Sequence, residues 1–281
     1  ANTASVEIQG AALLEILSVT SSQDPVTTGQ TRAWSIDVLV ANQGGSAVTL
    51  DMSDIDSTAV AVEGGTGFVF TRPAALLSGG VALPAGAAGT LRFTVSTTGT
   101  VPPGAALLSG RVIGTEDNSG TRIYDAITGP LGVNSVVFEE RPVPAYASAS
   151  LSPRVASTGS DIDIRLGIFS AEADQATLIL DREETRAWFG DADGDTFSTD
   201  LSALSGVTLE GGGSTTLTFN GATVSSDLDR TSYIVGVHLE GTENGNPFSA
   251  DITSAPDTLF IEEAPQLSIT SIEIPQLSLI H

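Results

Sequence analysis

The carboxylates best placed to do chemistry in this chain lie close together in its second half. Asp191, Asp193 and Asp195 alternate in the run D-A-D-G-D, and Asp200 follows downstream. Hard divalent cations take several carboxylate oxygens from a sharply turning loop, and the glycine of this run would bend the backbone. The run is no EF-hand, because its glycine comes fourth instead of sixth. The four aspartates are therefore a candidate calcium site, with a solvated acidic turn as the alternative.

Other side chains with binding chemistry have simpler structural interpretations. His238 lies in a strand-like run with no second internal histidine to share a metal, so we place it on a sheet face. Trp188 precedes the aspartates and could present a platform to a sugar ring, but core packing is the favoured interpretation. Trp34 is in register with apolar neighbours and is assigned to the core. A weaker acidic group is interpreted as a loop, namely Asp51, Asp54 and Asp56.

The residue types exclude most catalytic machinery, so we expect no enzyme. The chain has no Cys and no Lys, which rules out a thiol nucleophile, a thiolate metal site and a phosphate-binding G-x-x-x-x-G-K motif. No G-x-S-x-G elbow occurs, and a Ser nucleophile would lack an activating base. The adjacent pairs Glu183/Glu184 and Glu262/Glu263 would point to opposite faces of a strand, which favours hydrated turns and linkers over glycoside hydrolysis.

The charge balance disfavours two classes of partner. The chain of 281 residues carries 34 acidic and 11 basic residues, a net charge of −23. Such a surface repels nucleic acid phosphates and anionic lipid. No apolar run reaches the ~18 residues of a membrane span, so we expect no membrane insertion.

An internal duplication organises the chain. The pattern L-x-x-G-x-x-x-T-L-x-F begins at Leu83 and again at Leu209, and Gly114-Thr-Glu-Asp returns at Gly241 as Gly-Thr-Glu-Asn. The acidic, Pro-containing joint that follows Phe138 is echoed after Ile261. Two repeats of ordinary domain size fit the length. The predicted division is a first repeat over 1–140, a second over 141–265, and a remaining segment over 266–281.

Short alternating runs separated by turn residues predict two tandem antiparallel β-sandwiches in an extended arrangement, an all-β fold. Residues 33–40 alternate inward and outward, and Asn42-Gln-Gly-Gly is predicted to fold them into a hairpin with 47–50. A second hairpin is predicted to join 111–114 to 122–125 across an acidic, Gly-containing turn. No helical segments alternate with these strands, which excludes a parallel α/β fold.

The segment 266–274 has the character of an opening strand with no repeat after it. It occupies the position that residues 143–150 hold after the first joint, and it is apolar on one face. Unpaired strands seek sheet edges. We therefore expect either a longer array or head-to-tail self-association through 266–274 and the N-terminal strand of a neighbouring molecule.

The strand, Val40-Ala-Asn-Gln-Gly turn and following strand, with Gly89-Thr-Leu-Arg-Phe later on, resemble immunoglobulin-like tandem domains of bacterial and archaeal surface proteins, notably the CARDB-type modules. The resemblance covers most of 12–140 and is weaker in the second repeat, where Ser170-Ala-Glu-Ala-Asp replaces the turn. It implies an extracellular location and a role as structural subunit or repeat segment of a filament or cell-surface fibre. The alternative is an adhesion module that binds calcium or a surface glycan.

Overall fold

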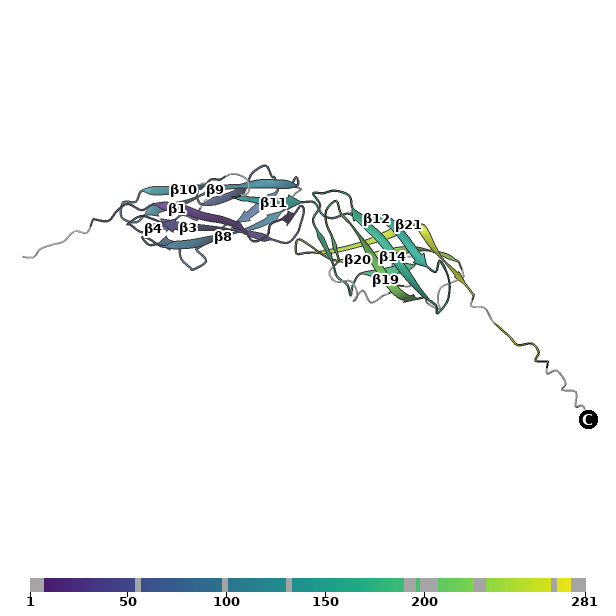
Figure 1. Ribbon diagram of the computed structural model, residues 1–281. Helices are drawn as coiled ribbons and strands as arrows, with labels where there is room; N and C mark the ends of the chain where they lie inside the picture. The colour runs from purple at the N-terminus through teal and green to yellow at the C-terminus, as the bar shows by residue number, and fades with distance from the viewer. Residues whose placement is uncertain are drawn as a thin grey trace, which may run out of the picture.

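The computed structural model describes residues 8–53, 57–97, 101–129, 133–189, 196–197, 207–224, 231–263 and 267–273. All regular secondary structure in these residues is β-strand, so the all-β prediction is confirmed. The strands form two sandwiches that lie end to end, one between residues 14 and 139 and one between 144 and 262 (Figure 1). Within the described part of the chain, no helix has the length and apolar character needed to cross a membrane.

The first sandwich has two facing sheets. One sheet runs in the order β1-β3-β8-β6, with the bounds Leu14–Ser21, Trp34–Asn42, Ala88–Thr97 and Phe68–Thr71. The other runs β2-β11-β9-β4-β7, with the bounds Val26–Thr27, Ser135–Glu139, Gly104–Glu116, Val48–Leu50 and Ala82–Leu83. Two further strands pair with β9, namely β5 (Ala59–Val62) and β10 (Arg122–Ile127). The first two strands of the chain, β1 and β2, belong to different sheets, and this division is an immunoglobulin-like arrangement.

The second sandwich repeats this plan. Its first sheet has the order β12-β14-β19, with the bounds Pro144–Ser152, Asp161–Ser170 and Ser214–Thr223. The facing sheet runs β13-β21-β20-β15-β18, with the bounds Val155–Ser157, Asn246–Glu262, Ser232–Glu243, Leu178–Leu180 and Thr208–Leu209. Next to β15, along the edge of β20 that faces away from β21, β20 also pairs with β16 (Arg186–Phe189), which pairs with β17 (Thr196–Phe197). The long β21 takes the places of β10 and β11.

Alternating apolar residues build each core. In β3 the buried side chains of Ile36 and Val38 lie opposite Phe93 and Leu91 of β8, and all four are fully buried. Burying one such side chain stabilises the fold by about 1.5–3 kcal/mol. The matching strands β14 and β19 of the second sandwich form the same kind of pairing. Each sandwich therefore has its own hydrophobic core, and the strands around that core hold the turns at its two ends in place.

The first strands of both sandwiches contain an irregularity at the same place. The register of β1 shifts between Ile16 and Ser18, and that of β12 shifts between Tyr146 and Ser148. Because of the extra residue, core-facing positions in β1 follow the spacing i, i+2, i+5, at Leu14, Ile16 and Val19. This spacing distinguishes a first strand of this fold from a simple alternating strand.

One of the two predicted hairpins is wrong. The turn after Asn42 does not fold β3 back onto β4, because β4 pairs with β9 and β7 in the facing sheet. The buried Asn42 side chain explains the crossing: its Nδ2 donates to the carbonyls of Ser46 and Leu83, at 2.8 and 3.1 Å. These residues do form a turn, but the turn carries the chain from one sheet to the facing sheet. The hairpin of β9 and β10 is confirmed.

Candidate interaction site

The most elaborate polar arrangement in the described residues lies where the two sandwiches meet. The hairpin of β20 and β21 ends at Glu243–Asn246, and its tip reaches the C-terminal end of the first sandwich (Figure 1). Asn244 and Gly245 at the tip have φ values of 45° and 76°. Positive φ at both central residues is what a type I′ turn requires, and Asn-Gly is its preferred pair. A local sequence choice thus shapes the end of the hairpin that enters the joint.

Glu243 is the centre of this joint. Its side chain is buried at 3% exposure, and its Oε2 accepts a hydrogen bond of 2.7 Å from Thr27 Oγ1 of the first sandwich. Its Oε1 lies 3.4 Å from Nε of Arg141 in the connecting segment. Burial raises the pKa of Glu243 above its ordinary value, against the opposing effects of Thr27 and Arg141. The carboxyl is held where water cannot solvate it well.

The neighbours of Glu243 add further bonds between the sandwiches. The Nδ2 of Asn244 donates to Thr27 Oγ1 at 3.1 Å and to Glu139 Oε2 at 3.0 Å. Side chains of the first sandwich also contact the turn: Gln23 donates to the Asn244 carbonyl at 2.9 Å, and Arg32 donates to the Gly245 carbonyl at 2.7 Å. Buried polar groups cost free energy unless they are paired, so this network selects one relative arrangement of the two units.

The connecting segment is bonded into the second sandwich. The Glu140 amide donates to the Asp174 carbonyl at 2.9 Å, and the Ala176 amide donates to the Glu140 carbonyl at 2.8 Å. The guanidinium of Arg141 lies 5.4 Å from the centre of the Phe248 ring, within cation–π range. The first joint is therefore part of the fold and not a free linker.

The first sandwich carries an equivalent hairpin at its far end. Glu116 of β9 stands where Glu243 stands in β20, and it is also buried. Its Oε1 accepts from the Ala12 amide at 3.1 Å, and its Oε2 accepts from Ser119 Oγ at 2.6 Å. These bonds, with Ser119 first, lower the pKa of Glu116. Here the carboxylate is satisfied within one sandwich, and residues 117–120 of the turn are exposed.

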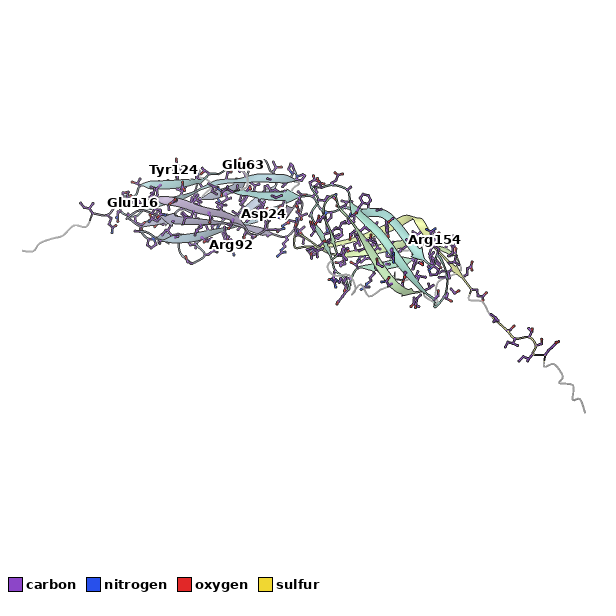
Figure 2. The ribbon with its side chains drawn as sticks, viewed as in Figure 1. Asp24, Glu63, Arg92, Glu116, Tyr124 and Arg154 are labelled. Atoms are coloured by element: carbon purple, nitrogen blue, oxygen red, sulfur yellow. The ribbon has the colours of Figure 1, made fainter. Side chains whose placement is uncertain are left out.

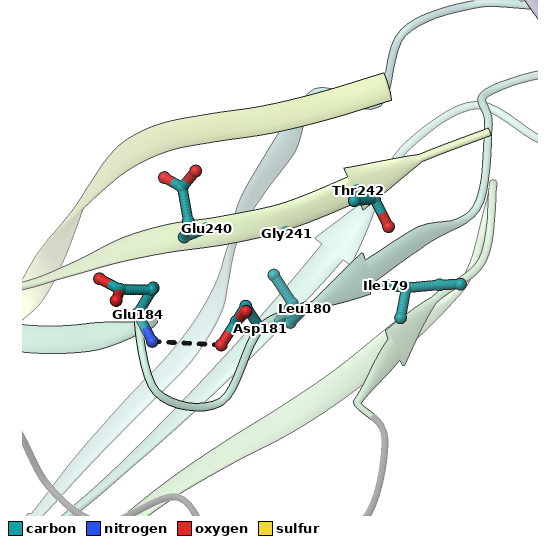
Figure 3. Close-up of a pocket in the computed structure, with 7 residues that line it drawn as sticks. All are labelled: Ile179, Leu180, Asp181, Glu184, Glu240, Gly241 and Thr242. Carbon is teal, nitrogen blue, oxygen red and sulfur yellow. Dashed lines mark hydrogen bonds between the residues drawn. The ribbon is translucent and has the colours of Figure 1, made fainter. Parts of the chain in front are cut away.

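The four aspartates of the predicted calcium site, Asp191, Asp193, Asp195 and Asp200, lie outside the described residues, so calcium stays a prediction. On the described surface of the second sandwich, a hollow gathers the carboxylates of Asp181, Glu184 and Glu240 (Figure 3). The Asp181 carboxylate already has partners within its own turn, because its Oδ1 accepts hydrogen bonds from the amides of Glu183 and Glu184. Within the described ranges, no group of three His, Asp or Glu residues is arranged to hold a metal ion.

The remaining predicted residues have structural roles. Trp188 is 2% exposed and packs against Gly236 of β20, so it offers no platform for a sugar. Trp34 is 3% exposed and lies in the first core. His238 lies half-exposed on a sheet face, with Nδ1 at 2.9 Å from Asp251 Oδ1. Asp51 accepts from Ser53 within its own loop, while its companions Asp54 and Asp56 lie outside the described residues.

The C-terminal segment projects from the second sandwich. Residues 267–273 form no strand, and their apolar side chains are exposed, with Leu267 at 95%, Ile269 at 79% and Ile272 at 77%. The spacing of these three residues is i, i+2, i+5, as in β1. Sequence reasoning identified this segment but missed the joint. The signal for the joint was available in the repeated Gly-Thr-Glu and in the Asn-Gly pair that follows its second copy.

No protein-family model matches this chain, and no curated protein matches it. Among solved structures, the chain is similar to the adhesin InvE of Yersinia pseudotuberculosis (13% identity, 92% of this chain and 66% of that chain, TM-score 0.23). It is also similar to BcpA, the major pilin subunit of Bacillus cereus (9%, 87% and 67%, 0.26), and to the CupB2 chaperone of Pseudomonas aeruginosa (9%, 84% and 100%, 0.24). These matches do not single out CARDB-type modules. The immunoglobulin-like architecture is shown by the strand order itself.

Proposed function

We propose that this protein is a structural subunit or repeat segment of an extracellular filament or cell-surface fibre. In this proposal the sandwiches serve as rigid spacers, and molecules associate head-to-tail through 266–274 and the N-terminal strand. No catalytic step is part of the role. The proposal gives the protein a partner of its own kind, and calcium binding at Asp191, Asp193, Asp195 and Asp200 stays a separate prediction.

The observation that carries the proposal is the interlocked joint. Domains joined by a plain linker move relative to one another by default. Here Glu243, Asn244 and Gly245 of the second sandwich are hydrogen bonded to Thr27 and Arg32 of the first. A joint with buried polar pairs maintains end-to-end alignment, which is the property that a fibre segment needs.

The exposed segment 267–273 supports the assembly part of the proposal. Three large apolar side chains in one short stretch are unfavourable in water, and their spacing suits a strand packed on a core. The N-terminal strand β1 is an edge of its sheet, in the order β1-β3-β8-β6, and an edge strand is the place where another strand can be added. A strand added in this way would gain backbone hydrogen bonds and at the same time bury its apolar face.

The test compares the full chain with a variant truncated after residue 266. Size-exclusion chromatography with light scattering is run over a concentration series, and negative-stain microscopy shows particle length. We expect the full chain to form linear oligomers and the truncated chain to remain a rod-like monomer. A full chain that stays monomeric at every concentration would overturn self-assembly, and equal assembly by both chains would remove the segment from the mechanism.

A further inference from the structure

We infer that the two outer ends of the chain dock on each other between copies and reproduce the internal joint without a covalent link. The hairpin tip of the first sandwich, residues 116–121, would seat on the C-terminal end of the second sandwich of another copy, at Ser157 and Glu262. This inference rests on the proposed function and names the surfaces that would meet. Its occupant is a second copy of this chain.

The C-terminal ends of the two sandwiches are built alike. In the first, Thr27 of β2 pairs with Glu139 of β11 in parallel register. In the second, Ser157 of β13 pairs with Glu262 of β21 in the same way. Both hydroxyl residues begin the same tight turn, in which the carbonyl of residue i accepts from the amide of residue i+3, at 3.3 and 3.0 Å. Ser157 therefore offers its hydroxyl where Thr27 offers the one that binds Glu243.

The hairpins at the N-terminal ends of the two sandwiches correspond at their glutamates, although the first has a four-residue turn (117–120) and the second a two-residue turn. Glu116 and Glu243 are both buried carboxylates at the end of the strand that leads into the tip. Asp117 holds the position of Asn244 in the duplicated Gly-Thr-Glu-Asx motif, and Asn118 follows it on an exposed turn. Figure 2 shows Glu116 near one end of the molecule and Arg154, which precedes β13, near the other. The two surfaces are thus far apart in one chain and free to meet only between chains.

Two hydrogen bonds of the internal joint have equivalent donors and acceptors at the proposed contact between copies. The Ser157 hydroxyl can donate to Glu116, as Thr27 donates to Glu243, and the Asn118 carboxamide can donate to Glu262, as Asn244 donates to Glu139. Ser119 now satisfies Glu116 Oε2 and would exchange that bond for the one from Ser157. Because one hydrogen bond from a hydroxyl to the carboxylate replaces another, the exchange is close to neutral and the contact remains reversible.

The C-terminal end also exposes apolar surface beside these groups. Val155 and Phe260 lie opposite each other on β13 and β21, at 47% and 49% exposure. Covering such a pair adds apolar contact to the two hydrogen bonds. Opposing this, each chain carries a net charge of −23, so copies repel one another at low ionic strength. We therefore expect the docking to strengthen with salt.

Introduced cysteines test the contact directly, because the native chain has none. The positive control is Thr27→Cys with Asn244→Cys, whose side chains meet in the internal joint and should close a disulfide within one chain. The test variant is Ser157→Cys with Asp117→Cys, the corresponding pair at the outer ends. On oxidation in high salt we expect a ladder of disulfide-linked multimers. The matched control is Ser157→Cys with Thr94→Cys, which places the second thiol on an exposed side position of β8.

The outcomes separate this inference from the proposed function. A ladder no stronger than that of the control, in a chain that still assembles by light scattering, overturns the docking and leaves the fibre role intact. A ladder that persists after truncation at residue 266 supports docking and removes the C-terminal segment from assembly. No ladder and no assembly overturns both proposals.

Discussion

Glu116 and Glu243 occupy the same place in the two sandwiches, yet their carboxyls are perturbed in opposite directions. Hydrogen bonds from Ser119 and Ala12 lower the pKa of Glu116, whereas burial raises the pKa of Glu243. The difference comes from the neighbour: within the described residues, the second hairpin is enclosed by the first sandwich, whereas residues 117–120 of the first hairpin are exposed. The same repeated residue therefore has a different physical role when another sandwich packs against it.

The largest difference between the two sandwiches is expected in β20, the strand that leads into the second hairpin. Trp188 packs on Gly236 of β20, and a Cβ at that position would lie 2.1 Å from the indole ring. Gly236→Ala forces the ring to move, and overpacking of this kind destabilises by about 1–3 kcal/mol. We expect a loss near the upper end of that range. The measurement is urea unfolding followed by tryptophan fluorescence.

Ser109 is the corresponding position in β9 and provides the control. Its side chain is partly exposed, so Ser109→Ala should change stability by less than about 0.5 kcal/mol. Each sandwich contains one tryptophan, Trp34 or Trp188, so Trp34→Phe and Trp188→Phe backgrounds report the two units separately. Equal losses from both substitutions would contradict the asymmetry between the units.

The next effect concerns the coupling of the sandwiches. Asn244→Ala removes the hydrogen-bond donors to Thr27 and Glu139. It also places alanine at a positive φ, where Asn is tolerated better because its polar side chain can hydrogen bond locally. We expect a loss of about 2 kcal/mol and a separation of the two unfolding midpoints, because the joint no longer links them. Asn118→Ala on the exposed turn of the first sandwich is the matched change. If Asn118→Ala separates the midpoints equally, the joint does not couple the units.

Calcium would sharpen the comparison if it binds, since the cluster around Asp193 occurs only in the second repeat. At ten times its dissociation constant, calcium would stabilise the second sandwich by about 1.4 kcal/mol. The Trp188 midpoint should then rise while the Trp34 midpoint stays constant. Calorimetry with Ca²⁺ should give heat for the wild type and none for Asp193→Ala. An absence of heat in both proteins would leave the acidic run as a solvated turn.

The smallest effects are the pH responses of the two glutamates, and they should differ in sign. A raised pKa means that Glu243 contributes most to stability below the ordinary value of 4.5 and that this contribution falls as pH rises through the raised value. Glu243→Gln keeps an acceptor for Thr27 without the charge, so at neutral pH it should be at least as stable as the wild type.

For Glu116 the direction reverses. Its lowered pKa means that its contribution is present above 4.5 and is lost as pH falls through the lowered value. Glu116→Gln should therefore be less stable than the wild type at neutral pH, and the difference should shrink in acid. Thermal melts of both variants at pH 7 and near pH 3.5 provide the measurement. Responses of the same sign would show that the two environments do not differ.

The all-β class and the strands with regular alternation could be predicted, because residues such as Ile36 and Val38 repeat at the period of a strand. The destination of the turn after Asn42 could not, because a turn signal does not say which sheet receives the next strand. The joint was harder still. Most of its hydrogen bonds join residues more than 200 positions apart, such as Thr27 and Glu243, and polar residues of this kind are also typical of exposed loops.

The bonding of Glu140 bears on how the molecule would respond to pulling. Its neighbour Glu139 belongs to the last strand of the first sandwich, while Glu140 itself is held between the carbonyl of Asp174 and the amide of Ala176 in the second. No slack chain separates the two units at this point. Tension applied to the ends would pass from one sheet to the next without first straightening a tether, so the array would behave as a stiff element with little low-force extension.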